Sequence, residues 1–191
     1  MFQELRASLG LLVFFVLLTG IGYPLLMTGL GETFFPYQAS GSLIQKDGKI
    51  IGSALIGQTF TSDKYFHARP SAAGDGYDAG NSSGSNLAPS SPDLIKTISA
   101  RVADLQKGGE TRPIPADLVM ASGSGLDPDI SVAAAKYQIP RIVEARGLPL
   151  PVLETLVANN TTPRSFGVLG ENRVNVLSLN QALDLLAASA P

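Results

Sequence analysis

The chain has 191 residues, no cysteine, and 14 Lys and Arg against 16 Asp and Glu, which gives a formal charge of −2. This balance argues against a nucleic-acid-binding protein, which usually presents a basic patch or stripe. The absence of cysteine excludes a disulfide framework, a zinc–thiolate site and a thiol nucleophile. The length fits one domain with an appendage.

Residues 7–31 form an uncharged run of 25 residues between Arg6 and Glu32. A helix needs about 20 apolar residues to cross the hydrocarbon core of a bilayer, so this run predicts a transmembrane helix. A cleaved signal peptide is the alternative, with an apolar region of about 7–15 residues followed by small residues. The run is longer than that, and we expect a membrane anchor.

The flanks of this run predict its orientation. Arg6 precedes the run, and no Lys or Arg follows it until Lys46. By the positive-inside rule the N-terminus is then cytoplasmic. The expected organisation is a cytoplasmic segment 1–6, a transmembrane helix 7–31 and an extracytoplasmic domain 32–191.

Gly20, Gly22 and Pro24 lie within the apolar run. Small residues let transmembrane helices approach closely, and a proline frees a carbonyl that can find another partner. These residues are therefore candidates for packing against other transmembrane helices. The alternative is that Gly and Pro are simply commoner in membrane helices than in soluble ones.

A hairpin is predicted directly after the apolar run. Residues 43–45 and 50–51 are apolar-rich and flank Lys46-Asp47-Gly48-Lys49, and Asp-Gly is a favoured tight-turn pair. The apolar residues 54–56 allow the second strand to continue. Residues 71–91 are rich in Gly, Ser and Asn and have no apolar periodicity, which predicts a long loop.

The second half of the chain predicts helices separated by short extended segments. Ser91-Pro92 is a helix start, since serine caps and proline fits the first helical position, and Gly108-Gly109 is a stop. Pro140 is expected to kink a helix or to begin a new one. The expected helices are 92–107, 131–138 continuing or restarting to 146, 149–158 and 178–188, and the expected extended segments are 118–120 and 174–177. This mixed order predicts an α+β domain, extracytoplasmic and anchored by one N-terminal transmembrane helix.

Motifs for nucleotide or metal binding are absent or incomplete. Gly48-Lys49 is followed by Ile50, which breaks the phosphate-binding P-loop pattern. Asp127-Pro128-Asp129 resembles the start of a calcium loop but lacks the Gly and Glu that such a loop requires, so we interpret it as a turn that leads into a helix. We expect no metal site and no directly bound cofactor.

His67 is the single histidine. A serine hydrolase would need it as its base, but no G-x-S-x-G or S-x-x-K pattern accompanies it. Three interpretations stay open for His67: a structural turn, a partner contact and catalysis. Arg141 and Arg146, with Glu144, are expected on a solvated helix face, with binding of an anion such as a phosphate group as the alternative.

Seven stretches, in order along nearly the whole chain, carry a resemblance to a known family: residues 23–26, 52–60, 65–72, 85–88, 121–128, 138–141 and 174–180. Together they resemble the C subunit of the bacterial potassium-transporting ATPase, the KdpC family.

The resemblance implies a non-catalytic accessory subunit of an ATP-driven, high-affinity potassium pump in the bacterial inner membrane. Its implied partners are a channel-like subunit, a P-type ATPase subunit that hydrolyses ATP, a small peptide subunit and the lipid bilayer. The implied roles are assembly of the complex and, as a catalytic chaperone, raising the ATP affinity of the ATPase subunit. Since the predicted topology places residues 32–191 across the membrane from a cytoplasmic ATP site, we expect an indirect effect on that affinity.

Residues of the long polar loop, of the Ser122–Asp127 turn and of the stretches that carry the resemblance are the expected partner contacts, because function is usually carried by loops on a rigid scaffold. The candidates are Tyr65, His67, Arg69, Ser85, Asn86, Ser122, Ser124, Asp127, Gln138 and Arg141. A membrane-anchored module that binds a small ligand is the alternative function, and an anchored hydrolase is a third.

Overall fold

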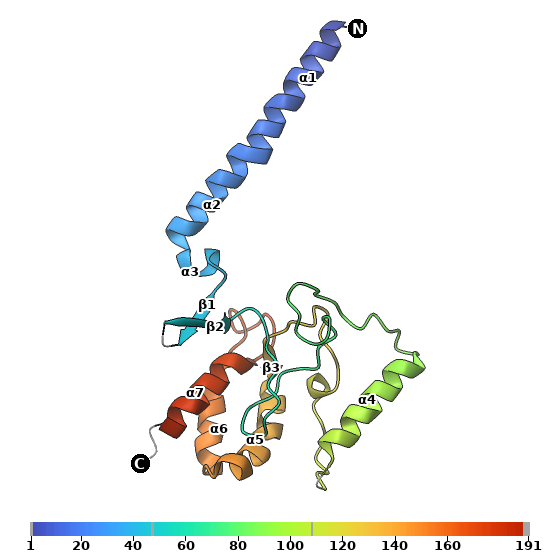
Figure 1. Cartoon of the computed structure of the whole chain (residues 1–191), viewed down its shortest axis with the longest axis vertical. Helices are drawn as coiled ribbons and strands as arrows, with labels where there is room; N and C mark the ends of the chain where they lie inside the picture. Colours follow the sequence, from blue (N-terminus) through green and yellow to red (C-terminus); the bar gives the residue numbers. More distant parts are fainter. Residues whose placement is uncertain (1, 47, 108, 189–191) are drawn as a thin grey trace. The chain divides into compact units, whose positions relative to one another are not determined.

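A computed structural model of the chain describes residues 2–46, 48–107 and 109–188 (Figure 1). The predicted turn residue Asp47 and the predicted stop residue Gly108 lie outside the described residues. The chain divides into two compact units, Met1–Ser53 and Ala54–Pro191. The predicted start of the extracytoplasmic domain at residue 32 stays a prediction.

The first unit begins with one long apolar helix. It consists of α1 (Phe2–Leu17), a π-helical turn η1 (Leu18–Gly22) and α2 (Tyr23–Phe34). The 33 residues have a mean hydropathy of 2.2 in their most apolar window. At 1.5 Å per residue the helix is about 50 Å long, and the hydrocarbon core is about 30 Å thick. The part of the chain that the structure describes thus contains one helix long and apolar enough to cross a membrane, as predicted.

The π-helical turn lies directly before Pro24. Proline has no N–H to donate, so the carbonyl four residues earlier loses its helical partner. The helical turn here contains one extra residue, because the Tyr23 N–H donates to the carbonyl of Leu18, five residues earlier. Such π-bulges are a known way of accommodating an interrupted helix. The predicted effect of Pro24 on the helix is therefore a local widening.

The predicted hairpin follows a short helix α3 (Pro36–Ala39) and consists of antiparallel β1 (Leu43–Lys46) and β2 (Lys49–Ser53). The suggested continuation of the second strand through residues 54–56 is wrong, because β2 ends at Ser53. The carbonyl of Ala54 accepts a hydrogen bond from Asn175 at 2.9 Å, and the Gly57 N–H donates to Leu126 at 2.8 Å. These bonds fix the chain after Ser53 to the second unit.

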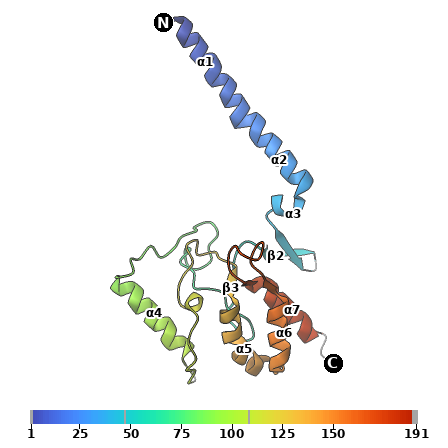
Figure 2. The same cartoon turned by 180° about the vertical axis from the view of Figure 1, so that it is seen from behind.

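In its described residues the second unit combines a small sheet with four α-helices, as expected for an α+β domain. The antiparallel sheet has the order β3-β5-β4. Figures 1 and 2 show α5, α6 and α7 side by side, with α4 apart from them. The elements in chain order are α4 (Pro92–Leu105), η2 (Ala116–Leu118), β3 (Asp129–Ser131), α5 (Val132–Arg146), α6 (Leu150–Asn159), β4 (Thr161–Thr162), β5 (Arg173–Asn175) and α7 (Val176–Ala188).

The hydrophobic core lies between α5, α6, α7 and the sheet. Its fully buried members include Ile142 of α5, Leu153 of α6, Leu183 of α7 and Val174 of β5. Phe66 joins this core from the long connection between β2 and α4 and is 0% exposed. Burial of one such side chain contributes about 1.5–3 kcal/mol, so Phe66 anchors its segment to the helices.

Two elements differ from their predictions, and a third decides between two predicted alternatives. Residues 118–120 were expected to be extended, but Ala116–Leu118 is a 3₁₀ turn, closed by hydrogen bonds from Val119 and Met120 to the Ala116 carbonyl. Helix α5 runs through Pro140 to Arg146 without a restart. Helix α7 begins at Val176, two residues earlier than expected, because the Asn175 side chain accepts from the Ser178 N–H at 3.0 Å and caps it.

Other predicted boundaries are confirmed within one or two residues. Ser131 caps α5 by accepting from the Ala134 N–H at 3.0 Å, and α5 ends before Gly147. Residues 71–91 contain no helix or strand, as predicted. The two-residue strand β4 and the three-residue strand β3 were not predicted, since segments this short have no readable periodicity.

Candidate functional site

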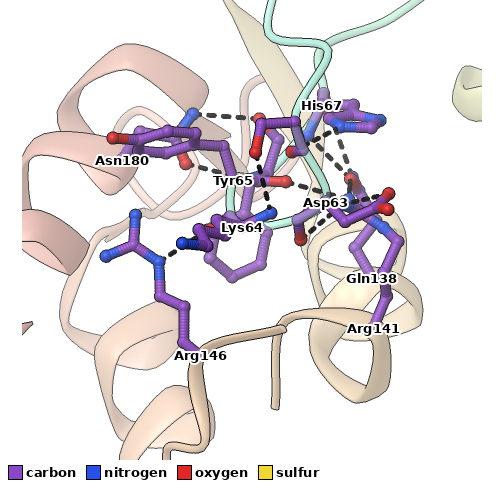
Figure 3. Close-up of polar contacts among 10 residues, drawn as sticks. Asp63, Lys64, Tyr65, His67, Gln138, Arg141, Arg146 and Asn180 are labelled. Atoms are coloured by element: carbon purple, nitrogen blue, oxygen red, sulfur yellow. Dashed lines mark hydrogen bonds and ion pairs between the residues drawn. The ribbon is translucent and has the colours of Figure 1, made fainter. Parts of the chain in front are cut away.

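Residues 63–67 pass α5 and α7 as an irregular segment that begins in a turn, in which the Tyr65 N–H donates to the Ser62 carbonyl at 3.0 Å, and we call it the clamped segment. Figure 3 shows side chains of both helices converging on its backbone. Backbone N–H and C=O groups outside helices and sheets need other partners. Here four helix side chains supply those partners: Gln138, Arg141, Arg146 and Asn180.

Two buried amides bind the centre of the clamped segment (Figure 3). The Phe66 N–H donates to Asn180 Oδ1 at 2.8 Å, and Asn180 Nδ2 donates to the Phe66 carbonyl at 2.9 Å. The His67 N–H donates to Gln138 Oε1 at 2.7 Å, and Gln138 Nε2 donates to the His67 carbonyl at 3.0 Å. Each side-chain amide thus accepts from the N–H and donates to the carbonyl of one residue, as the backbone of a neighbouring strand does in a sheet.

Two arginines hold the beginning of the clamped segment. Arg141 donates to the carbonyls of Asp63 at 2.7 Å and Tyr65 at 2.9 Å. Arg146 donates to the Lys64 carbonyl at 2.7 Å and pairs with Asp184 at 2.8 Å. Its guanidinium also lies 4.7 Å from the centre of the Tyr65 ring, a cation–π distance. Arg141 therefore does not occupy a merely solvated helix face; it is half-buried, and burial lowers its pKa.

His67 belongs to the same structure. Burial lowers the pKa of His67, with a further lowering by the positive charge of Arg141. Its Nε2 lies 3.1 Å from the Ser62 carbonyl, so a neutral imidazole with the proton on Nε2 donates there. This arrangement favours the structural interpretation of His67 over catalysis, because the ring serves a backbone contact.

A second group of candidates lies in what we call the loop cluster, residues 69–86 against 122–127. The Ser71 hydroxyl donates to the Gly125 carbonyl at 2.6 Å and accepts from the N–H groups of Ala73 and Tyr77. The Ser124 carbonyl accepts from the Ser83 N–H at 3.0 Å. Part of the long polar loop is thereby folded onto the turn at Ser122–Asp127.

At Gly125 the turn at 122–127 packs closely against the loop that contains Ala73 and Ser83. Its φ is +68°, and a Cβ placed there would lie 2.6 Å from both the Ala73 nitrogen and the Ser83 oxygen. Only glycine fits this combination of backbone angle and space. The Ser-Gly-Ser-Gly turn is thus required for close packing of the two loops.

Arg69 and Asp127 form the charged part of the loop cluster, with Nη1 and Oδ2 2.9 Å apart. The Tyr77 hydroxyl donates to the Arg69 carbonyl at 2.6 Å. Burial, with the nearby charge of Asp127, raises the pKa of Tyr77 to about 12. Arg69 Nε is buried and has no hydrogen-bond partner among the residues that the structure describes.

The structure thus sorts the ten predicted contact residues into two groups and three outliers. Tyr65, His67, Gln138 and Arg141 meet at the clamped segment, and Arg69, Ser124 and Asp127 meet in the loop cluster. Ser122 is buried, whereas Ser85 and Asn86 are exposed, the latter with a φ of +49°. Contact of any of them with a partner stays a prediction.

A cleft of about 880 Å³ borders the clamped segment, between the C-terminal half of α4 and α5. Its charged lining is balanced, with four cations and four anions: Arg101, Lys107, Arg112, Arg141, Asp63, Asp104, Glu110 and Glu144. Three of the cations pair with lining carboxylates, Lys107 with Asp104, Arg112 with Glu110 and Arg141 with Asp63. Arg101 donates to the Val119 carbonyl at 2.8 Å. Among the described residues, three of the four lining cations are thus paired with carboxylates and the fourth is hydrogen-bonded to a carbonyl, which makes the cleft poorly suited to a polyphosphate.

Sequence reasoning missed three residues of these clusters: Asn180, Asp184 and Tyr77. Asn180 had a readable signal, since it stands beside Leu179 and Leu183 on a face that is otherwise apolar. A lone amide on such a face is expected to satisfy a buried backbone. The expectation of a solvated Arg146 is wrong, because its side chain is 10% exposed. The contacts of Arg146 and Asp184 join segments distant in sequence, which no local pattern reveals.

Comparisons with known proteins point to one family. A family model described as "KdpC: K+-transporting ATPase, c chain" matches residues 5–185. A "Potassium-transporting ATPase KdpC subunit" of Gemmatimonas aurantiaca is 56% identical over 193 residues, covering 100% of this chain and 97% of that protein. Proteins of the same name from Acidobacterium capsulatum and Methylococcus capsulatus are 55% and 54% identical, covering 95% and 97% of this chain and 98% and 100% of their own lengths.

Proposed function

The chain belongs to the family of KdpC subunits of potassium-transporting ATPases, and we propose that it acts as a non-catalytic subunit that holds the pump together from the outer face of the membrane. The observation that carries the proposal is the family match over residues 5–185 in a chain with one long apolar helix. In this proposal the helix packs among the transmembrane helices of its partners through Gly20, Gly22 and Pro24.

The helix has the surface that such packing requires. An added Cβ would meet no atom within 4 Å at Gly20, and only the Leu17 carbonyl at 3.7 Å at Gly22. The small residues thus leave a shallow face on the helix that another helix can fill. The partners are the channel-like subunit, the P-type ATPase subunit and the small peptide subunit.

The clamped segment and the loop cluster provide a rigid platform for partner contacts on the second unit. Rigid presentation lowers the entropy that a partner must overcome on binding. The exposed residues Ser85 and Asn86 extend from this platform, and we assign them to the interface.

Any effect on ATP affinity is indirect in this proposal. The balanced, paired charges of the cleft make it a poor polyphosphate site, and the predicted topology separates the second unit from a cytoplasmic ATP site. A catalytic chaperone of this kind acts through a coupling free energy between distant sites, which must be reciprocal: potassium-side contacts of this subunit strengthen when ATP binds.

The experiment compares the purified pump with and without this subunit. We expect loss of the chain to dissociate the remaining subunits or to reduce potassium-stimulated ATP hydrolysis and raise the KM for ATP. Normal assembly with normal potassium-dependent turnover in its absence would reject the proposal. Direct photolabelling of the second unit by an ATP analogue would reject the indirect mechanism alone.

A further inference from the structure

The long apolar helix ends in a corner that turns the chain back on itself. Phe35 leaves the helical conformation with a φ of −137° and a ψ of 52°, and α3 follows directly. A Cβ added at Gly31 would lie 4.0 Å from the Ala39 Cβ, so α3 packs against the last turn of α2 (Figure 1). Residues 31–39 therefore stay together instead of continuing along the helix axis.

Hydrogen bonds hold this helix corner, residues 31–42, in one conformation. The Ala39 N–H donates to the Phe35 carbonyl at 2.8 Å, and the Ser42 N–H donates to the Tyr37 carbonyl at 2.9 Å. The Tyr37 hydroxyl donates to the Ser42 carbonyl at 3.2 Å, and Ser42 is 4% exposed. The corner thus presents its side chains at a fixed position relative to α2.

Three aromatic side chains of the helix corner face outward. Phe34 is 67% exposed, Phe35 60% and Tyr37 49%. Phe34 and Phe35 are consecutive residues, so their side chains do not share one helix face that a neighbouring helix could cover. The hydroxyl of Tyr37 is hydrogen-bonded within the corner, and its ring is left as apolar surface. Aromatic rings spread in this way at the end of an apolar helix are typical of the interface between hydrocarbon and lipid headgroups.

The length of the uncharged run places the helix corner at the membrane surface. The 25 residues between Arg6 and Glu32 span about 38 Å as a helix, compared with a hydrocarbon core of about 30 Å. Both charged residues therefore reach the headgroup layers, because a charged side chain is costly in the hydrocarbon core. Phe34 and Phe35 follow Glu32 directly along the chain, and the packing of α3 against α2 keeps Tyr37 near the same depth. The aromatic surface is thus continuous with the part of the bilayer that the helix crosses.

We propose that Phe34, Phe35 and Tyr37 anchor the helix corner in the lipid headgroup layer and thereby limit how far the membrane helix slides along the bilayer normal. The helix needs such a stop, because its uncharged run exceeds the hydrocarbon core by about 8 Å. The inference rests on the proposed function only where that function places the helix in a membrane. It holds for either orientation of the chain, since aromatic belts occur at both interfaces.

The chain contains no tryptophan, so a single introduced tryptophan reports its own depth. The full-length variants Phe35→Trp and Leu25→Trp are reconstituted in phosphatidylcholine vesicles, and fluorescence quenching by lipids brominated at different acyl positions is measured. Position 35 is expected about 15–22 Å from the bilayer centre, in the headgroup layer, and position 25 well inside the hydrocarbon core. A position 35 deep in the core, or one that no brominated lipid quenches, would overturn the proposal. If position 25 is not quenched either, the helix does not enter the bilayer, and the proposed function fails as well.

Removal of the rings tests the anchoring itself. In the Leu25→Trp chain, Phe34→Gln together with Phe35→Gln should shift the tryptophan by about 3 Å or more, the rise of two helical residues. The matched control is Leu43→Gln together with Ile50→Gln, which replaces two apolar residues of the hairpin in the same unit, 38% and 60% exposed, and should leave the depth unchanged. An equal depth in the variant without the rings and in its parent would contradict the anchor.

A photoreactive benzoylphenylalanine at position 35 identifies the neighbour of the helix corner in intact cells that express the whole pump. An adduct with phospholipid is expected. An adduct with another pump subunit, or with a second copy of this chain, would show that protein covers the rings and would overturn the proposal.

Discussion

Asn180→Leu isolates the contribution of the clamp at Phe66. The substitution keeps the approximate volume of the side chain but removes the acceptor at 2.8 Å and the donor at 2.9 Å. The Phe66 N–H and carbonyl are then left buried beside a side chain that is 0% exposed. Each unsatisfied buried group costs about 1–3 kcal/mol, so the free energy of unfolding should fall by about 2–6 kcal/mol.

The assay is thermal unfolding of the full chain in detergent, followed by circular dichroism. For a chain of this size 1 kcal/mol shifts Tm by about 2–4 °C, so a decrease of roughly 5–20 °C is expected. Asn159→Leu is the control, because Asn159 is exposed at the end of α6, and it should shift Tm by less than about 2 °C. Equal shifts for the two variants would refute the assignment of Asn180 as a backbone clamp.

Three further predictions use the same assay or a titration. Gly125→Ala should destabilise the loop cluster by about 2 kcal/mol or more, whereas Gly123→Ala, whose Cβ meets no atom within 4 Å, should stay within about 0.5 kcal/mol; equal effects would contradict the close approach. Because the folded chain lowers the pKa of His67 below 6.5, the unfolded chain binds the proton more readily, so the stability contributed by the neutral ring is lost as pH falls below about 6.5. His67→Gln should flatten the decline in Tm between pH 7 and pH 5, and an unchanged slope would contradict this. Ultraviolet titration should show one tyrosine ionising near pH 12, absent in Tyr77→Phe; its persistence in the variant would reassign the group.

The helices were predictable because their signals are local. Ser131, Gly147 and Ser91-Pro92 lie at the ends of helices where capping chemistry places them, and the apolar run at 7–31 falls within the continuous helix Phe2–Phe34. The choice between a continued and a restarted helix at Pro140 was not predictable. Arg112 donates to the Tyr137 carbonyl at 3.0 Å, within the turn that the proline disturbs, and this contact comes from 25 residues away.

The candidate site was predictable in its members but not in its arrangement. Tyr65, His67, Gln138 and Arg141 were selected individually, yet their shared role at the backbone of the clamped segment depends on α5 and α7 lying together. The turn at Phe166, between β4 and β5, was overlooked because Phe-Gly is not a recognised turn pair, and its positive φ becomes visible only in the structure.

Topology tests the central claim most directly, and the chain suits the measurement because it has no cysteine. Ser99→Cys introduces one thiol at an exposed position of α4 that is not among the proposed partner contacts, and Gln3→Cys introduces one before the apolar run. With a membrane-impermeant maleimide on intact cells that express the whole pump, the account predicts labelling at position 99 and protection at position 3 until the cells are lysed. Labelling at position 3 with protection at position 99 would place the second unit in the cytoplasm and contradict an outer-face subunit.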